Sequence, residues 1–73
     1  MWHQIGMWTP MELDAVMVPQ ALATDEGVEG KGAIVWHVAS APYATVECRV
    51  LDENPDGLRT KLLDIPIADL RPI

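Results

Sequence analysis

The clearest pattern in the chain is a two-residue alternation of apolar and polar side chains over residues 43–51. The apolar set is Ala44, Val46, Cys48 and Val50, and the polar set is Thr45, Glu47 and Arg49. This period is that of a β-strand with one face buried and the other in water. We therefore predict a strand over residues 43–51 whose even-numbered side chains point into the core.

Three further runs rich in apolar and β-branched residues lie between proline and glycine breakers. They span residues 13–18, 33–38 and 58–65, and residues 71–73 add a short fifth candidate. The six prolines and five glycines leave little room for long helices. The sequence therefore predicts four or five strands.

The strands over residues 43–51 and 58–65 are predicted to pair as a hairpin around an acidic loop at residues 52–57. In the second strand Thr60 and Leu62 are expected to face the core. Arg59 and Lys61 are then expected to lie on the solvent face beside Glu47. Opposite charges across such a strand pair contribute roughly 0.2–1 kcal/mol each.

The run over residues 33–38 has no predominantly polar face. This suits a central strand that is covered on both sides, or a strand whose outer face is a contact surface. The preceding residues 19–32 carry Asp25, Glu26 and Glu29 together with three glycines. They are predicted to form a long solvated loop that ends in a Gly-x-Gly turn, with helix only over residues 20–23.

In this order the elements resemble a small SH3-like barrel. More narrowly, the chain resembles an uncharacterised family of short bacterial proteins with a KOW-like barrel, a domain of unknown function. The resemblance covers about residues 11–72 and rests on the segments Leu13-Asp14-Ala15-Val16, Gly30-Lys31-Gly32-Ala33-Ile34-Val35, Tyr43-Ala44-Thr45-Val46-Glu47 and Pro66-Ile67-Ala68-Asp69-Leu70-Arg71-Pro72. It implies an all-β, SH3-like barrel of four to five antiparallel strands but no particular activity, because this fold hosts many unrelated functions.

The predicted barrel covers residues 11–73 and is preceded by an aromatic extension at residues 1–10. The extension holds two of the three tryptophans and two of the four methionines. Three interpretations remain open. It covers an open edge or end of the barrel, it is a flexible tail partly produced by an upstream start codon, or it is an aromatic anchor for a partner.

The length and net charge of the chain exclude several classes of function. A chain of 73 residues with net charge −6 is expected to fold as one small domain. Eleven acidic residues against five basic ones disfavour nucleic acid and suggest a basic partner. No apolar stretch approaches the roughly 20 residues of a membrane span, so no membrane association is expected. The single cysteine and the lack of a signal-type N-terminus indicate the cytoplasm.

No catalytic or metal-binding set is visible in the sequence. His3 and His37 each follow a tryptophan, and neither has a Cys or His at metal-ligand spacing. Cys48 falls on the inward face of its strand, where it is expected to be a small buried apolar residue. We therefore expect no enzyme activity, no metal and no cofactor.

These observations predict a non-catalytic binding or accessory module that binds a protein. The expected partner-binding residues lie on the apolar strand and the loops beside it: Trp36, His37 and Tyr43, next to Asp25, Glu26 and Glu29. Aromatic side chains are common at binding hot spots, and acidic loops select basic partners. The sequence does not identify that partner.

Two other functions stay open. One is an acidic inhibitor or nucleic-acid mimic of phage type that blocks a basic groove, with the charges of residues 52–56 added to those of residues 25–29. The other is KOW-like binding of RNA or the ribosome, which the fold suggests and the negative charge opposes. A homodimer is also expected, with the extension in or near its interface, because a small barrel leaves strand edges open.

Overall fold

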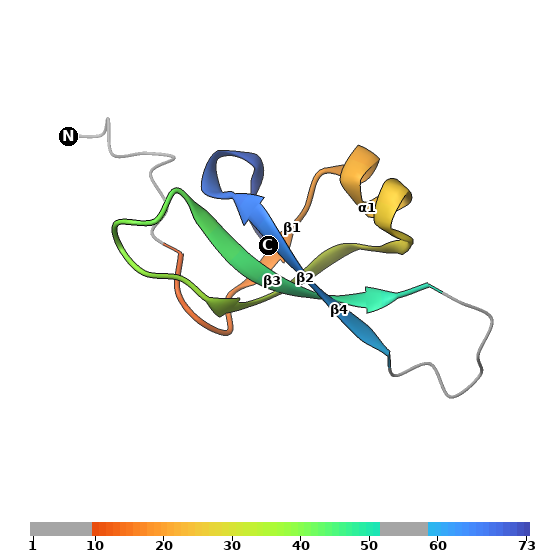
Figure 1. Ribbon diagram of the computed structural model, residues 1–73, viewed down its shortest axis with the longest axis horizontal. Coiled ribbons are helices and arrows are strands. Elements are labelled where there is room, and N and C mark those ends of the chain that lie inside the picture. Colours follow the sequence, from red (N-terminus) through yellow and green to blue (C-terminus); the bar gives the residue numbers. More distant parts are fainter. Residues whose placement is uncertain (1–9, 52–58) are drawn as a thin grey trace.

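The computed structural model describes residues 10–51 and 59–73. Its elements in chain order are β1 (Ala15–Met17), α1 (Gln20–Glu26), β2 (Val28–Trp36), β3 (Tyr43–Val50), β4 (Thr60–Pro66), the 3₁₀ turn η2 (Ile67–Asp69) and β5 (Arg71–Pro72) (Figure 1). The aromatic extension, apart from Pro10, and the acidic loop at residues 52–57 lie outside the described residues.

The five strands form one antiparallel sheet in the order β4-β3-β2-β1-β5. The four strands β1 to β4 follow one another as a meander, and β5 returns after η2 to pair with the other side of β1. The predicted small all-β fold and its short fifth strand are confirmed. Among the described residues, no ladder joins the edge strands β4 and β5.

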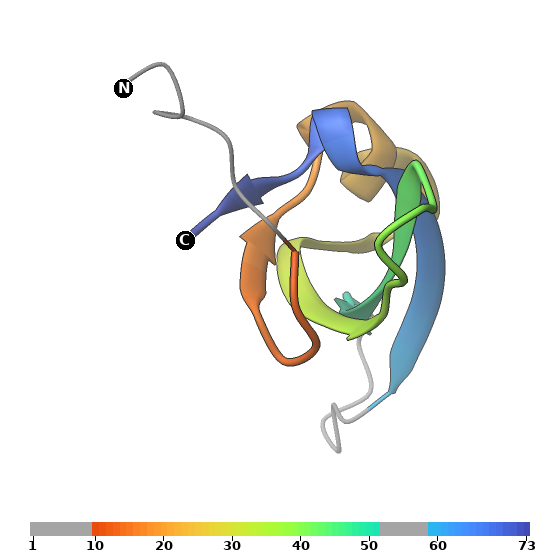
Figure 2. The same cartoon turned by 90° about the vertical axis from the view of Figure 1, so that its left-hand side faces the viewer.

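The core fills the inner side of a strongly curled sheet (Figure 2). Ten of the described residues are buried there, among them the fully buried Val16, Ile34, Val46 and Ile65. Helix α1 contributes Ala23, and Leu70 follows η2 into the same cluster. Both α1 and η2 lie on one side of the sheet (Figure 1 and Figure 2). Each fully buried aliphatic side chain stabilises the fold by about 1.5–3 kcal/mol relative to exposure.

The alternation predicted for β3 is confirmed. Ala44, Val46 and Cys48 are fully buried, whereas Thr45 and Glu47 between them are not. Burial raises the pKa of the Cys48 thiol, and the Glu29 carboxylate raises it further. The cysteine is therefore a protonated core side chain at neutral pH.

The predicted facing of β4 is wrong. Leu62 is 60% exposed and Ile65 is fully buried, so the odd-numbered side chains of β4 face the core. The register sets this parity, because Ile65 lies opposite Ala44 and Leu62 opposite Glu47. Glu47 consequently accepts a hydrogen bond from Thr60 at 3.3 Å, and the predicted pairing with Lys61 on one face does not form. Burying Leu63 and Ile65 removes more apolar surface than burying Thr60 and Leu62.

Lys61 lies on the other face of β4 and contacts α1. Its Nζ is 2.6 Å from a carboxylate oxygen of Glu26. Both side chains are partly exposed, so the pair contributes at most about 1 kcal/mol. It nevertheless connects the helix to the outermost strand of the meander.

The helix predicted over residues 20–23 is confirmed but is longer than predicted, and the long loop predicted for the rest of residues 19–32 is wrong. Residues 20–26 form a helix because they include good helix formers, with Pro19 before the first turn and Gly27 after the last. Gly27 adopts the left-handed conformation, with φ 69°, and its N–H caps the carbonyls of Ala23 and Thr24. Leu22 and Ala23 pack against the core. This burial was not predicted because the acidic residues that follow them favoured a solvated loop.

Strand β2 therefore begins at Val28, and the predicted Gly-x-Gly turn is wrong because Gly30 and Gly32 lie within this strand. Gly32 lies directly against β3, where a Cβ atom would come within 2.8 Å of Val46 Cγ1 and 3.0 Å of Cys48 Sγ. Glycine in a strand interior commonly marks such a close approach. The predicted central position of this strand is confirmed, since β2 pairs with β1 on one side and β3 on the other.

Candidate functional site

A shift in strand register turns Trp36 out of the core. Ile34 lies opposite Val46, but Trp36 lies opposite Thr45 instead of Ala44. Thr45 belongs to the outward set of β3 and donates a hydrogen bond to Asp64 at 2.6 Å. An extra residue in one strand re-aims the side chains that follow it, and such bulges occur often at functional sites.

The bulge places Trp36 beside Tyr43. The two ring centroids are 5.5 Å apart and the planes are inclined by 31°. Each of the two residues keeps 38% of its surface exposed, and Val38 in the connecting loop is 45% exposed. We name this group of three residues, Trp36, Val38 and Tyr43, the aromatic end. It presents two adjacent aromatic residues that are each partly exposed in the described part of the chain.

His37 holds the loop between β2 and β3 in place. A ring nitrogen of His37 lies 3.2 Å from the carbonyl oxygen of Ala41, across the turn. A second backbone bond, from Ala41 N–H to the Val38 carbonyl, closes the same turn at 2.9 Å. The His37 ring therefore acts as a support for the aromatic end.

The predicted acidic residues do not lie beside these rings. Asp25 and Glu26 end α1 and Glu29 follows in β2, whereas Trp36 is the last residue of β2. Six residues of extended chain lie between Glu29 and Trp36, which places them roughly 20 Å apart. Two of these carboxylates have basic neighbours: Glu26 pairs with Lys61, and Glu29 lies 3.9 Å from Arg49.

Other carboxylates lie at the same end of the molecule as Trp36, Val38 and Tyr43. The turn at residues 11–14 contains Glu12, the end of β4 contains Asp64, and η2 contains Asp69. These segments meet β2 and the following loop: Leu13 N–H bonds to Ile34 O, and Ile67 N–H to Pro42 O (Figure 1). The segments 11–14, 36–43 and 64–69 contain no Lys or Arg. No sequence motif predicts that Glu12, Asp64 and Asp69 lie at one end of the molecule, because the order of the strands brings these three segments together.

Basic residues gather at the opposite end of the sheet. Lys31 lies within β2, and Arg49 is the last residue but one of β3. Arg59 directly precedes β4, and Lys61 is the second residue of β4. Antiparallel pairing brings these positions to the same end, next to α1. Four of the five basic side chains thus lie toward the α1 end of the sheet, and the fifth, Arg71, lies opposite Met17 in β5. Among the described residues, Glu12, Asp64 and Asp69 form no ion pair.

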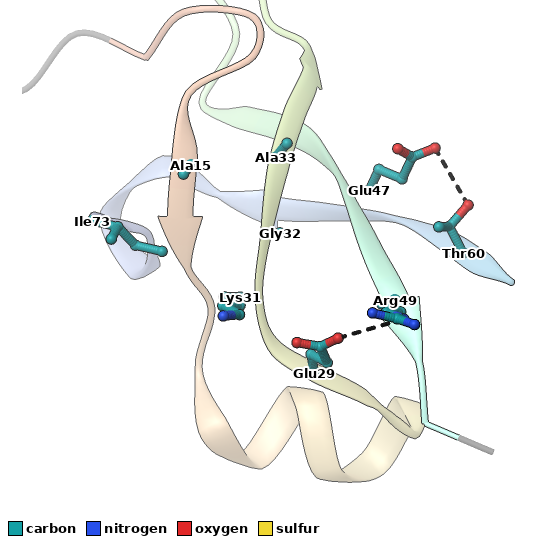
Figure 3. Close-up of a pocket in the computed structure, with 9 residues that line it drawn as sticks. All are labelled: Ala15, Glu29, Lys31, Gly32, Ala33, Glu47, Arg49, Thr60 and Ile73. Atoms are coloured by element: carbon teal, nitrogen blue, oxygen red, sulfur yellow. Dashed lines mark hydrogen bonds and ion pairs between the residues drawn. The ribbon is translucent and has the colours of Figure 1, made fainter. Parts of the chain in front are cut away.

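The outer face of the sheet carries a second feature, an open hollow of about 600 Å³ (Figure 3). Its floor is made of the small residues Ala15, Gly32 and Ala33. Figure 3 shows Glu29 and Arg49 pointing toward one another at one end, Glu47 and Thr60 along one side, and Ile73 on the opposite side. We name it the outer hollow.

Within the described ranges 10–51 and 59–73, no group of three or more His, Cys, Asp or Glu side chains is arranged to hold a metal ion. In the same ranges no helix has the length and apolar character needed to cross a membrane. No family model, curated protein or solved structure matches the chain.

Proposed function

We propose that the chain is a non-catalytic protein-binding module whose aromatic end engages a basic segment of its partner. The observation that carries this proposal is the Trp36–Tyr43 pair. A register shift in β2 turns Trp36 away from the core, and the pair is left partly exposed. Trp and Tyr contribute most strongly at protein interfaces because they bury large area with few rotatable bonds.

Charge supports the choice of a basic partner. A Lys or Arg side chain placed over either ring gains a cation–π attraction of about 0.5–2 kcal/mol. The carboxylates of Glu12, Asp64 and Asp69 lie at the same end of the molecule and add long-range attraction. This arrangement also accelerates association, since a net charge of −6 steers a cationic partner toward the domain.

The acidic-inhibitor function shares part of this chemistry but uses a different surface. It needs the carboxylates near α1 together with Asp52, Glu53 and Asp56, which lie outside the described residues. Two of the carboxylates near α1, Glu26 and Glu29, already have basic neighbours. Rim charges of this kind change association rates more than affinity. We therefore favour the aromatic end over the end that carries α1.

The test is quantitative capture of binding proteins from a host lysate with the wild-type domain and with the W36A/Y43A double variant. A matched control is L51A, which truncates a residue that is 64% exposed and directly follows the end of β3 away from Tyr43. We expect the double variant to lose the proteins that wild type and L51A retain, and those proteins to dissociate as NaCl is raised. Retention of every partner by a folded double variant would contradict the proposal.

A further inference from the structure

Asp64 lies on the same face of the sheet as the aromatic pair. Thr45 of β3 is opposite Trp36 of β2 on one side and opposite Asp64 of β4 on the other. Side chains directly opposite one another in adjacent strands point to the same face. Trp36, Thr45 and Asp64 therefore form a row across three strands, which we name the outer row. Tyr43 precedes Thr45 by two residues and so lies on this face as well.

The Asp64 carboxylate is oriented within the outer row. Thr45 Oγ1 donates a hydrogen bond to Oδ1 of Asp64 at 2.6 Å. A carboxylate has about four lone-pair sites on its two oxygens, so Oδ2 and part of Oδ1 can still accept hydrogen bonds. Asp64 forms no ion pair with any of the described residues, and Lys61, the basic residue nearest to it in the sequence, contacts Glu26 on the other face. The outer row therefore offers an oriented negative charge to a cation from outside the described residues.

The spacing within the outer row suits a flat cation. Neighbouring strands lie about 4.8 Å apart, so Trp36 and Asp64 stand about 10 Å apart across Thr45. The Trp36 and Tyr43 rings have centroids 5.5 Å apart, and each residue keeps 38% of its surface exposed. A cation placed above Thr45 can contact an aromatic ring on one side and the Asp64 carboxylate on the other.

We propose that the outer row binds an arginine side chain of the partner, whose guanidinium lies against the Trp36 ring and donates hydrogen bonds to Asp64. This inference rests on the proposed function and deepens it, because it selects arginine among the basic residues. A guanidinium is planar and weakly hydrated, and its N–H groups form a rigid fork. It therefore stacks on an aromatic ring and binds a carboxylate through two bonds at once. A lysine ammonium is a compact, strongly hydrated charge, so it gains less from the same two surfaces.

The test is an NMR titration of the isotope-labelled whole chain with three blocked amino acids, the N-acetyl amides of arginine, lysine and citrulline. Lysine has the charge without the planar group, and citrulline has the planar group without the charge. The indole N–H of Trp36, assigned by its loss in W36F, reports binding. We expect arginine to bind with a dissociation constant on the order of 1 mM, about 5-fold more tightly than lysine or citrulline.

D64N tests the role of the carboxylate. The asparagine side chain keeps an oxygen that accepts the Thr45 hydrogen bond but lacks the negative charge. We expect D64N to weaken arginine binding about 5-fold and to abolish the preference over lysine. D69N is the matched control, because it makes the same replacement in η2, outside the outer row. At about 0.15 M NaCl, where exposed charges are screened, D69N should keep the preference and lose at most about twofold in affinity.

Circular dichroism checks that each variant is folded. Equal affinities of wild type for arginine and lysine, no binding of arginine at about 20 mM, or an arginine preference that D64N retains would each overturn the inference. The proposed function fails separately, when W36A/Y43A captures every partner that wild type captures from a lysate. If arginine and lysine bind wild type equally and W36A/Y43A loses both, the choice of arginine is wrong and the role of the aromatic end stands.

Discussion

Replacing Gly32 by alanine is expected to disrupt the sheet at its most tightly packed point. The added Cβ would lie 2.8 Å from Val46 Cγ1 and 3.0 Å from Cys48 Sγ, and closer still to the carbonyl oxygen of Glu47. The carbonyl belongs to the β3 backbone, so it cannot rotate away as a flexible side chain does. Relief requires β2 and β3 to separate where Gly32 pairs with Cys48.

The expected destabilisation follows from this geometry. Overpacking a core position costs about 1–3 kcal/mol, and a backbone clash belongs at the upper end of that range. A single core in a domain this small supplies about 3–5 kcal/mol of net stability. G32A should therefore lose about 3 kcal/mol, which leaves about 0–2 kcal/mol and a substantially populated unfolded state at room temperature.

Two other glycines provide matched controls with the same chemical change. At Gly30 the new Cβ meets only the Oε1 atom of Gln20, at 3.2 Å, and that side chain can move aside. G30A should stay within about 0.5 kcal/mol of wild type, since it also removes part of the entropic cost of glycine in a strand. At Gly27 no atom lies within 4 Å, but φ is +69°, so G27A should lose about 1 kcal/mol through backbone strain alone.

Urea unfolding followed by circular dichroism measures the three variants at one protein concentration, because any dimer makes the midpoint depend on concentration. The predicted order of stability is G30A, then G27A, then G32A. A midpoint for G32A equal to that of wild type, or a G27A variant less stable than G32A, would refute the packing argument.

Three further changes test separate parts of the fold. Leu13 is 83% exposed and has a left-handed φ of 72°, so L13G should raise the melting temperature by about 5 °C in a thermal scan, and a lower value would contradict the backbone geometry. The pKa of Cys48 is raised above 9.0, so the stabilisation linked to it is present below pH 9 and is lost as pH rises through the folded-state pKa. Wild type should lose unfolding free energy relative to C48A over that range, and a difference independent of pH would contradict the burial. K61A should cost about 0.5 kcal/mol in urea unfolding at low salt and less at about 1 M NaCl, whereas a cost insensitive to salt would rule out the Glu26 ion pair as its cause.

The sequence predicted those parts of the fold that depend on simple alternation. The inward set of β3 was predictable because its polar and apolar residues differ strongly in the cost of burial. Which face of β4 is buried could not be predicted, because Leu62 and Leu63 are adjacent and point to opposite faces. The face is set by the pairing of Ile65 with Ala44, which the sequence of β4 alone does not show. Alternation cannot resolve two neighbouring leucines.

Helix α1 shows a different limit. The acidic residues Asp25 and Glu26 suggested a solvated loop, but Gly27 immediately after them is a strong helix stop that could have been used. The Gly-x-Gly segment suggested a turn because close approach between strands cannot be seen in one strand alone. In each case the decisive neighbour, Val46 or Cys48 for Gly32, is distant in the sequence.

The candidate site was predictable in part. Trp36 and Tyr43 were expected to act together, and the structure places their rings 5.5 Å apart. The acidic residues expected with them lie at the other end of β2, since a helix and a full strand intervene. Glu12, Asp64 and Asp69 come from three separate segments, so only the strand order brings them to the aromatic end.

The central claim is tested most directly by NMR titration of the isotope-labelled domain with a captured partner or its basic segment. The account predicts that the largest chemical-shift changes occur at the Trp36 indole N–H and at the backbone amides of Val38 and Tyr43. It also predicts that W36A/Y43A abolishes these changes in a folded domain. Shifts centred on Asp25, Glu26 and Glu29, with the aromatic end unaffected, would contradict it.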